Sequence, residues 1–440
     1  MRICFVAPHA YAALSGRADL PPGGGAEVQQ VIVSRELARR GWHVSAVTLD
    51  MGQADGVVHQ GVTIWKFCAR KKSRCRPLRT WSKWRALWRA MERADADIYY
   101  QRAAGSETGL AALWCQWKRK KFVFATASDT NCIAALPDLR SLGERILYRA
   151  GLRMARKIIC QTRGQAAALG HHFGVSSTVI RNCTPDPYPG VKRLVRPRDQ
   201  GPQRILWVGR LSPKKRPDWF LDLAESCPKL RFDFVGGGKP GDPYADPLVR
   251  RAAQIPNVVQ HGWIPLDRMG EFYEGSALLV CTSSAEGFPN TFLEAWARGV
   301  PTVSTVDPDQ TIESEGLGMV GRTFAELRAS LLSLAESPKR LEDCGVRARN
   351  WYSRNHSIAR CVSALERELV GGDDAADRTG WPAASAHRAT AQDHNAVRTG
   401  ARRTGYQGSA EFRGASIAEG NDGSNAPAVH GPSMGREWPK

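Results

Sequence analysis

Short apolar runs alternate with stretches of helical period along the first 370 residues, and this alternation limits the possible folds. Strands that are apolar on both faces and alternate with helices form parallel sheets with helices on both sides. The predicted strands fall into two series, which are 2–7, 42–48, 98–101, 121–125, 157–161 and 177–180, then 204–208, 231–235, 258–261, 277–281 and 302–304.

A segment rich in proline and glycine at 184–190, followed by a basic stretch, separates the two series. We therefore predict an α/β fold of two doubly wound, Rossmann-like domains, 1–190 and 202–350, which face each other across a cleft and are joined by a linker at 191–201. A last helix at 351–370 is expected to pack back across both domains. Residues 371–440 contain no leucine and eleven glycines. They bury too little apolar surface to offset chain entropy, so a disordered tail is predicted.

The net charge is +19, and the 62 basic and 43 acidic residues are unevenly placed. The tail holds eight of each sign, so the whole excess lies in the first 370 residues. This excess predicts an anionic partner such as a nucleotide, a nucleic acid or an anionic lipid surface. The eleven cysteines occur singly, which favours free thiols over a zinc site. Without a signal segment or an 18-residue apolar run, we expect a cytoplasmic protein with no transmembrane helix.

Two loops at strand ends carry features suited to phosphate. Gly24 and Gly25 lie in a glycine turn before a helical stretch, where backbone N–H groups could cradle a diphosphate or simply form the turn. In the second series, four cations occur within the seven residues 210–216. We expect Arg210 and Lys215 to neutralise the phosphate oxygens of a leaving group, although a solvated basic loop would look the same.

The segment after the strand at 277–281 carries the sharpest pattern. Asn290 is a plausible helix N-cap, so Glu294 would lie in the first turn and point back to accept from ribose hydroxyls. Glu286 lies in the preceding loop, free to contact a sugar. We expect the residues between them to surround an anion, and these are Phe288, Pro289, Asn290 and Thr291. Alternatively, both glutamates merely favour a helix N-terminus electrostatically.

At these residues the chain resembles the family 4 retaining glycosyltransferases of the GT-B fold. Glu286 and Glu294, with seven residues between them, look like the E-x7-E motif of that family, and Arg210 with Lys215 resembles its Arg-x4-Lys pair. The similarity covers about residues 1–370. It implies a sugar nucleotide donor, retention at the anomeric carbon and no metal at the active site. It also implies that Arg210 and Lys215 grip the diphosphate, Glu294 the ribose and Glu286 the sugar.

The chain departs from the family pattern on the acceptor side. Many members carry a histidine at the end of a strand in the first domain, whereas 124–131 contains none. Ser128 or Asp129 could take that place, and His9, just after the first strand, could face the cleft. Front-face transfer lets the departing phosphate oxygen take the acceptor proton, so a separate base is not required.

A basic, tryptophan-rich segment runs from 70 to 93, with ten Lys or Arg and one acid. Trp81, Trp84 and Trp88 fall at helical spacing, which is the composition of an interfacial helix on anionic lipid. The alternative is a buried stripe of a domain helix.

These features together favour a retaining, metal-independent hexosyltransferase without a cofactor. It would transfer a hexose from a nucleotide sugar to a lipid-linked or polysaccharide acceptor in cell-surface glycan synthesis, at the inner membrane face. Two alternatives stay open. One is a sugar-nucleotide epimerase or hydrolase, and the other is a non-enzymatic basic protein that binds membrane or nucleic acid. The leading hypothesis includes no specific nucleic-acid partner.

Overall fold

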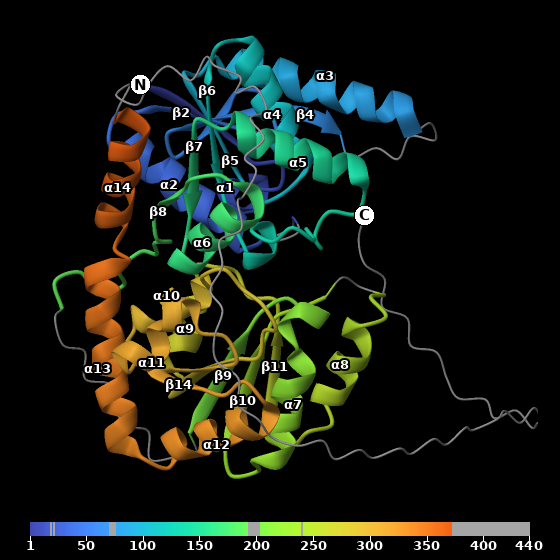
Figure 1. The fold of residues 1–440 in the computed structure, drawn as a ribbon. Coiled ribbons are helices and arrows are strands. Elements are labelled where there is room, and N and C mark those ends of the chain that lie inside the picture. Colours follow the sequence, from blue (N-terminus) through green and yellow to red (C-terminus); the bar gives the residue numbers. More distant parts are fainter. Residues whose placement is uncertain (18–19, 21–22, 70–75, 192–202, 239–240, 372–440) are drawn as a thin grey trace, which may run out of the picture. The chain divides into compact units, whose positions relative to one another are not determined.

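Two largely parallel sheets organise the chain, each with helices on both faces (Figure 1). The computed structural model describes residues 1–17, 20, 23–69, 76–191, 203–238 and 241–371, but not the side chains of 68, 69 and 76–81. The predicted linker at 191–201 lies almost wholly outside these residues, and so does the predicted tail at 371–440. All eleven predicted strands are present, and the predicted fold of two Rossmann-like domains is confirmed.

The first sheet has the strand order β3-β4-β2-β1-β5-β6-β7-β8, and β3 and β4 pair antiparallel. Its strands are β1 (Arg2–Val6), β2 (His43–Asp50), β3 (Val57–His59), β4 (Val62–Ala69), β5 (Ile98–Arg102), β6 (Lys121–Ala125), β7 (Lys157–Cys160) and β8 (Thr178–Val179). Its helices are α1 (Tyr11–Ser15), α2 (Gly25–Arg39), α3 (Arg76–Ala94), α4 (Ser106–Trp117), η1 (Asp129–Asn131), α5 (Leu142–Met154) and α6 (Arg163–Phe173).

The second sheet is parallel throughout, in the order β11-β10-β9-β12-β13-β14. Its strands are β9 (Arg204–Val208), β10 (Arg231–Val235), β11 (Val258–Gly262), β12 (Leu278–Cys281), β13 (Thr302–Ser304) and β14 (Gly318–Val320). The helices that follow β9 are η2 (Pro213–Lys215), α7 (Pro217–Ser226), α8 (Ala245–Ala252), α9 (Met269–Glu274), α10 (Asn290–Trp296), η3 (Pro308–Gln310), α11 (Thr311–Glu315), α12 (Phe324–Ala335), α13 (Pro338–Asn355) and α14 (Ile358–Val370).

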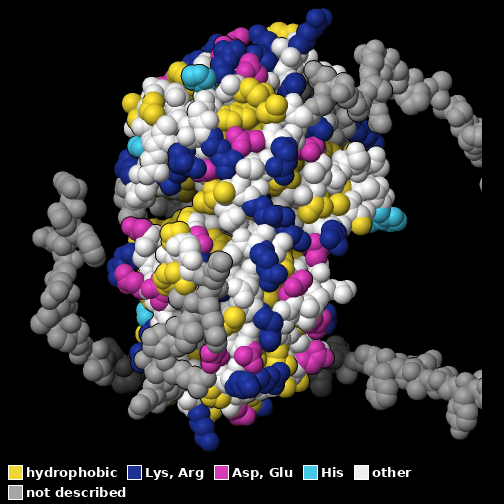
Figure 2. All heavy atoms as spheres, turned by 90° about the vertical axis from the view of Figure 1, so that its left-hand side faces the viewer, with side chains coloured by type: hydrophobic (Ala, Val, Ile, Leu, Met, Phe, Trp, Pro, Cys, Tyr) yellow, Lys and Arg dark blue, Asp and Glu magenta, His cyan; other side chains and the backbone are white. Residues whose placement is uncertain are grey.

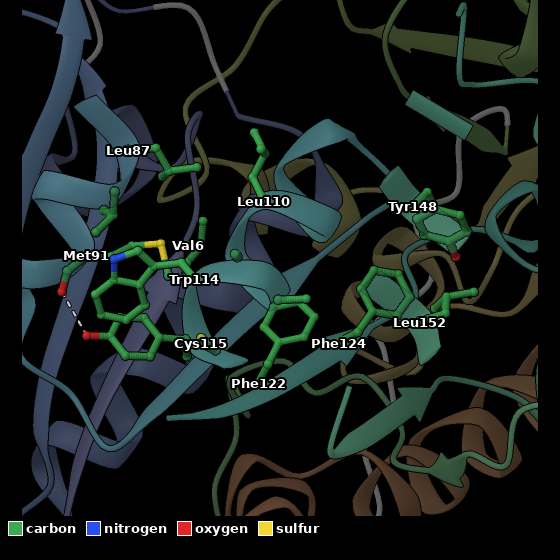
Figure 3. Close-up of a cluster of buried hydrophobic side chains, with 14 of the residues drawn as sticks. Val6, Leu87, Met91, Leu110, Trp114, Cys115, Phe122, Phe124, Tyr148 and Leu152 are labelled. Carbon is green, nitrogen blue, oxygen red and sulfur yellow. Dashed lines mark hydrogen bonds between the residues drawn. The ribbon is translucent and has the colours of Figure 1, made fainter. Parts of the chain in front are cut away.

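Each sheet has a buried cluster on either face. Figure 3 shows one in the first domain, where Trp114 of α4 packs edge-on against Tyr99 of β5, with ring centroids 4.9 Å apart. Helices α4 and α5 approach closely because Gly109 has no side chain. A Cβ there would lie 2.2 Å from the carbonyl oxygen of Leu147. The core therefore holds the two helices against the same face of the sheet.

The end of the chain differs from the single helix predicted at 351–370. Two helices are present, and they break at His356 and Ser357. Trp351 of α13 lies in the core of the second domain, whereas Leu365 of α14 lies in the core of the first. The chain thus returns to the first domain through the break. Figure 2 shows acidic and basic side chains interspersed on the face with α13 and α14, so the excess charge is not gathered there.

Two further predictions concern thiols and membrane spans. The described cysteine thiols are free and buried, as predicted. Among the described residues no helix combines the length and the apolar character needed to span a bilayer.

Candidate active site

The basic loop after β9 is locked to the loop after β12. Arg216 has φ +44° and donates from its guanidinium to the carbonyl oxygen of Thr282 at 2.8 Å. The Thr282 hydroxyl donates to the carbonyl oxygen of Lys215 at 2.7 Å, and the Ser284 N–H donates to that of Lys214 at 2.8 Å. These bonds fix the backbone of Lys214 and Lys215. The side chains with their ammonium groups therefore extend from a rigid backbone.

Lys215 and Glu286 form an ion pair between the two loops. The Lys215 Nζ lies 2.5 Å from the Glu286 Oε1, and the side chains are 29% and 14% exposed. Burial alone would lower the pKa of Lys215, but the Glu286 carboxylate outweighs it, so the net shift is upward. Lys215 therefore stays protonated, and the predicted proximity of this cation and this carboxylate is observed.

Arg210 and Lys214 both approach the first domain. The Lys214 Nζ donates to the Ser128 hydroxyl at 2.8 Å, which joins η2 to the loop after β6 across the domains. Arg210 is exposed, and its Nη2 lies 3.7 Å from where a Cβ would stand on Gly24. Among the described residues neither cation forms an ion pair. Two cations without an ion pair in that part of the chain thus lie beside the glycine turn and the end of β6.

The glycine turn fits closely against the second domain. A Cβ on Gly25 would lie 3.1 Å from the Asn290 Nδ2, and that amide donates to the Gly25 carbonyl oxygen at 3.0 Å. The Gly24 N–H donates to the Glu27 carboxylate at 2.8 Å, as in a capping box. The Gly24 N–H is therefore engaged by Glu27, and diphosphate binding by the turn at Gly24 and Gly25 stays a prediction.

Phe288 and Asn290 take part in the contact between the two domains. The Phe288 N–H donates to the Gln161 Oε1 at 2.7 Å, and the Phe288 ring is buried against Trp351 and His356. A buried side-chain amide thus holds the Phe288 N–H, and an anion held by the segment from Phe288 to Thr291 stays a prediction. Asn290 is the first residue of α10, and Pro289 holds the cap position. The predicted Asn290 cap is also wrong, since its side chain bonds to the first domain instead.

Glu294 lies on α10 and makes a different contact from Glu286. Its Oε2 accepts from the buried Tyr273 hydroxyl at 2.6 Å, and burial raises its pKa. Within the described chain its carboxylate forms no hydrogen bond or ion pair with Arg210, Lys214 or Lys215. Thr291 lies partly exposed one turn earlier. The structure therefore joins Glu286 directly to Lys215, while a ribose contact by Glu294 stays a prediction.

Asp129 lies on the acceptor side, next to Glu286. Its N–H donates to the Glu286 carbonyl oxygen at 3.3 Å, and its Oδ1 accepts from the Gln165 Nε2 at 2.9 Å. Partial withdrawal from water raises the pKa of Asp129 to about 6. The Gln165 hydrogen bond opposes this rise, and the Glu286 carboxylate adds to it. His9 is exposed, with its carbonyl oxygen 3.7 Å from a Cβ built on Gly23.

A network of side-chain amides, which the sequence did not single out, holds the domains together. The Asn182 Nδ2 donates to the Phe288 carbonyl oxygen at 3.1 Å, and the Gln29 Nε2 donates to the Asn290 Oδ1 at 3.1 Å. These residues are buried polar groups near strand and helix ends. Their only sequence signal is a polar amide beside an apolar run, which many surface positions share.

The tryptophans of α3 lie against the core. Trp84 and Trp88 are partly buried in the first-domain cluster, and the Trp88 Nε1 donates to the Leu110 carbonyl oxygen at 3.0 Å. This packing favours the buried-stripe alternative over the predicted membrane contact, because the rings already have protein neighbours. The Trp81 side chain lies outside the described residues. The described residues also contain no group of three or more His, Cys, Asp or Glu that could hold a metal ion.

Two family models match the two domains in turn. Residues 23–186 match the glycosyltransferase family 4 model, and residues 202–336 match a model of the glycosyl transferases group 1. A D-inositol 3-phosphate glycosyltransferase of Mycobacterium leprae is 30% identical over 189 residues, 39% of this chain and 42% of the relative. An alpha-galactosylglucosyldiacylglycerol synthase of Streptococcus pneumoniae is 27% identical over 38% of this chain and 46% of its own length. The chain thus spans under half the length of these two relatives.

Solved structures show the same fold at low sequence identity. Sucrose-phosphate synthase from Thermosynechococcus elongatus superimposes with a TM-score of 0.70 at 16% identity, over 84% of this chain and 99% of the other. Anabaena HepE in complex with UDP and glucose superimposes with a TM-score of 0.65 at 16% identity, and the shares of the two chains covered are the same. The predicted GT-B fold is confirmed, and the similarities together support a glycosyltransferase.

Proposed function

We propose that the chain is a retaining hexosyltransferase that takes its sugar from a nucleoside diphosphate. The observation that carries the proposal is the ion pair of Lys215 and Glu286 beside two further cations, Arg210 and Lys214, where the two domains touch. A diphosphate leaving group needs positive charge, and a sugar needs a carboxylate that can accept from its hydroxyls. Both occur here on loops at the carboxyl ends of strands, where doubly wound folds bind ligands.

Binding of the donor would change the partner of Lys215. In the structure its ammonium lies 2.5 Å from the Glu286 carboxylate, which neutralises it. A diphosphate between Arg210 and Lys215 competes for that ammonium and releases the carboxylate to accept from a sugar hydroxyl. We expect Arg210 to bind the phosphate with its planar fork and Lys215 to act as a point charge. Glu294 is assigned to the ribose hydroxyls by the same proposal.

The reaction we propose occurs on one face of the sugar. The bond from the anomeric carbon to the phosphate oxygen breaks, and the acceptor oxygen bonds to the same face. The acceptor proton passes to the departing phosphate oxygen, so no separate base is required. Asp129 and Ser128 lie at this edge of the first domain and are assigned to hydroxyl groups of the sugar or acceptor. Because Arg210 and Lys215 supply the charge, we expect activity without a metal ion or cofactor.

We propose a glycan or lipid-linked acceptor used at the cytoplasmic face of a membrane. The names of the two relatives support this, since one acts on an inositol phosphate and the other makes a glycosyl diacylglycerol. In place of the α3 tryptophans, we assign the lipid contact to Trp117. It is 69% exposed, with the Lys118 Nζ 4.5 Å from its ring. Vesicles of anionic lipid should sediment the wild type more than Trp117→Ala, and equal sedimentation would refute this contact.

The test of the function is product analysis with sugar nucleotides. The purified chain is incubated with UDP-, GDP- and ADP-hexoses and a panel of glycoside and glycolipid acceptors, with and without chelator. We expect one donor to yield a glycoside with the anomeric configuration of the donor. Glu286→Gln should abolish product while leaving the circular dichroism spectrum unchanged. An isomerised or merely hydrolysed nucleotide sugar, or an inverted product, would contradict the proposal.

A further inference from the structure

Arg102 is a cation near the domain contact that the donor-binding roles above do not use. We propose that its guanidinium binds an anionic group of the acceptor, a phosphate or a carboxylate. This inference rests on the proposed function, and it narrows the acceptor to an anionic class. Arg102 ends β5, the strand between β1 and β6, and lies in register with Ala125 of β6. It therefore lies at the same edge of the sheet as Ser128 and Asp129, which follow β6.

The guanidinium has only neutral partners in the described structure. Its Nη2 donates to the Asn182 Oδ1 at 2.7 Å, and its Nε is buried without a hydrogen-bond partner there. The group also lies beside the Tyr100 hydroxyl, where its charge opposes the rise that burial causes in the pKa of Tyr100. Arg102 forms no ion pair with the described residues. A partly buried charge without a counter-ion is costly, and a bound anion would offset that cost.

The acidic side chains of the adjoining loops already have other partners. Glu107, at the start of α4, pairs with Lys83 at 2.7 Å. Asp129 accepts from a glutamine amide, and Glu286 pairs with Lys215. None of these carboxylates forms an ion pair with Arg102 in the described structure. Arg102 thus has no counter-ion among the described residues, and an anionic substrate would provide one.

The backbone around Arg102 is held rigidly. The buried Gln101 amide donates to the Arg102 and Ala103 carbonyl oxygens at 3.0 and 2.7 Å, and its Oε1 accepts from the Thr108 hydroxyl at 2.9 Å. Ala103 has φ +75°, a left-handed conformation that residues with a Cβ rarely adopt. Strain held by surrounding bonds is common at binding sites, because it fixes the direction of a neighbouring side chain.

Asn182 connects Arg102 to the donor side. The Asn182 amide donates to the Phe288 carbonyl oxygen at 3.1 Å and to the Asn290 Oδ1 at 3.3 Å, and both belong to the segment after Glu286. An anion on Arg102 would thus lie next to the loop that holds the donor. The donor diphosphate already has Arg210 and Lys215 on the second domain. We therefore assign Arg102, on the first domain, to the acceptor.

The competing explanation is that Arg102 only positions Asn182, so the test separates the two. The full chain is saturated with whichever of UDP, GDP or ADP binds best, and inorganic phosphate is titrated in by phosphorus NMR. The variants are Arg102→Gln, Asn182→Ser and a matched control, Arg181→Gln. Arg181 is also partly buried, and its Nη1 likewise donates to an asparagine, the Asn355 Oδ1 at 2.8 Å.

We expect Arg102→Gln to weaken phosphate binding about tenfold or more, which is the loss of one charge-assisted hydrogen bond. Arg181→Gln should keep the wild-type affinity for phosphate, and Asn182→Ser should weaken it less than Arg102→Gln does. Nucleotide affinity should stay within about twofold in Arg102→Gln and Arg181→Gln. An equal loss in Asn182→Ser would overturn the inference in favour of positioning. An equal loss of nucleotide would assign Arg102 to the donor.

Failure of the proposed function has a different signature. If the wild type binds none of the nucleotides, the donor assignment fails. Phosphate titrated into the nucleotide-free chain then still decides whether Arg102 holds an anion. If phosphate binds the wild type no better than it binds Arg102→Gln in either state, the anion site itself is refuted.

Discussion

Replacement of Gly287 by alanine should drive the two domains apart at the site. Gly287 follows Glu286, and a Cβ there would lie 2.8 Å from both the Gln161 Oε1 and the Gln165 Nε2, and 3.1 Å from the Ala127 carbonyl oxygen. All three atoms belong to the first domain. The φ of Gly287 is not in the left-handed region, so glycine is needed for space and not for its backbone conformation.

The contacts set the size of the effect. The Gln161 side chain cannot swing away freely, because its Oε1 accepts from the Phe288 N–H at 2.7 Å and its Nε2 donates to the Thr126 carbonyl oxygen at 2.9 Å. Overpacking of this kind costs about 1 to 3 kcal/mol, and the loss of the Phe288 bond adds about 1 kcal/mol. The total of about 2 to 4 kcal/mol corresponds to a decrease of about 30- to 700-fold in the equilibrium population of the arrangement in which the domains are in contact.

The assay compares Gly287→Ala with Gly164→Ala for release of nucleotide from the preferred donor. Gly164 lies on the same side of the contact, in α6, but a Cβ there would meet its nearest atoms only at 3.8 Å. We expect Gly287→Ala to lose at least about tenfold in kcat/KM, with faster hydrogen exchange at the Phe288 amide. Its thermal unfolding should change little, because each domain keeps its own core. Wild-type turnover in Gly287→Ala would refute the reasoning.

Two further predictions concern charge. Lys215→Met should weaken nucleoside diphosphate binding about tenfold or more, measured by calorimetry, while Lys229→Met, at an exposed position, should not. Burial lowers the pKa of His356 to about 3, so below about pH 6.5 the unfolded chain binds a proton that the native state excludes. The free energy of unfolding should therefore fall by up to about 1.4 kcal/mol per pH unit as the pH drops from about 6 to 4. His356→Gln should show a shallower fall in urea titrations, and an unchanged slope would contradict the assignment.

The sequence predicted the sheets well because buried parallel strands are apolar on both faces. The strands that it missed are β3, β4 and β14. Strands β3 and β14 are short, whereas β4 carries an apolar pattern that was overlooked. Strand β3 has three residues, and it joins β4 through Gln60 and Gly61, which both have positive φ as a tight hairpin turn requires. Glutamine is an unusual residue in that turn. The hairpin was therefore hidden by its turn chemistry, while the neighbouring parallel strands were visible.

The candidate site was predicted where chemistry and local sequence coincide, and missed where tertiary packing decides. Cations within seven residues and a nearby carboxylate can be recognised in a sequence, and Lys215 and Glu286 do meet. Asn290 has the residue type of a helix cap, yet its amide bonds to Gly25, 265 positions earlier. No local pattern encodes that contact, because it depends on how the two domains face each other.

The break between α13 and α14 shows why the relative orientation of the two domains is coupled to the candidate site. His356 donates from Nδ1 to the Asn182 carbonyl oxygen at 2.7 Å, and its ring centroid lies 4.9 Å from that of Phe288. Asn182 in turn donates to the Phe288 carbonyl oxygen. The segment that follows Glu286 is thus bonded to the same residues that carry the chain back to the first domain. A rotation of one domain at this break would have to move Phe288, and with it Glu286. Opening of the domains would therefore also separate the Glu286 carboxylate from the acceptor side.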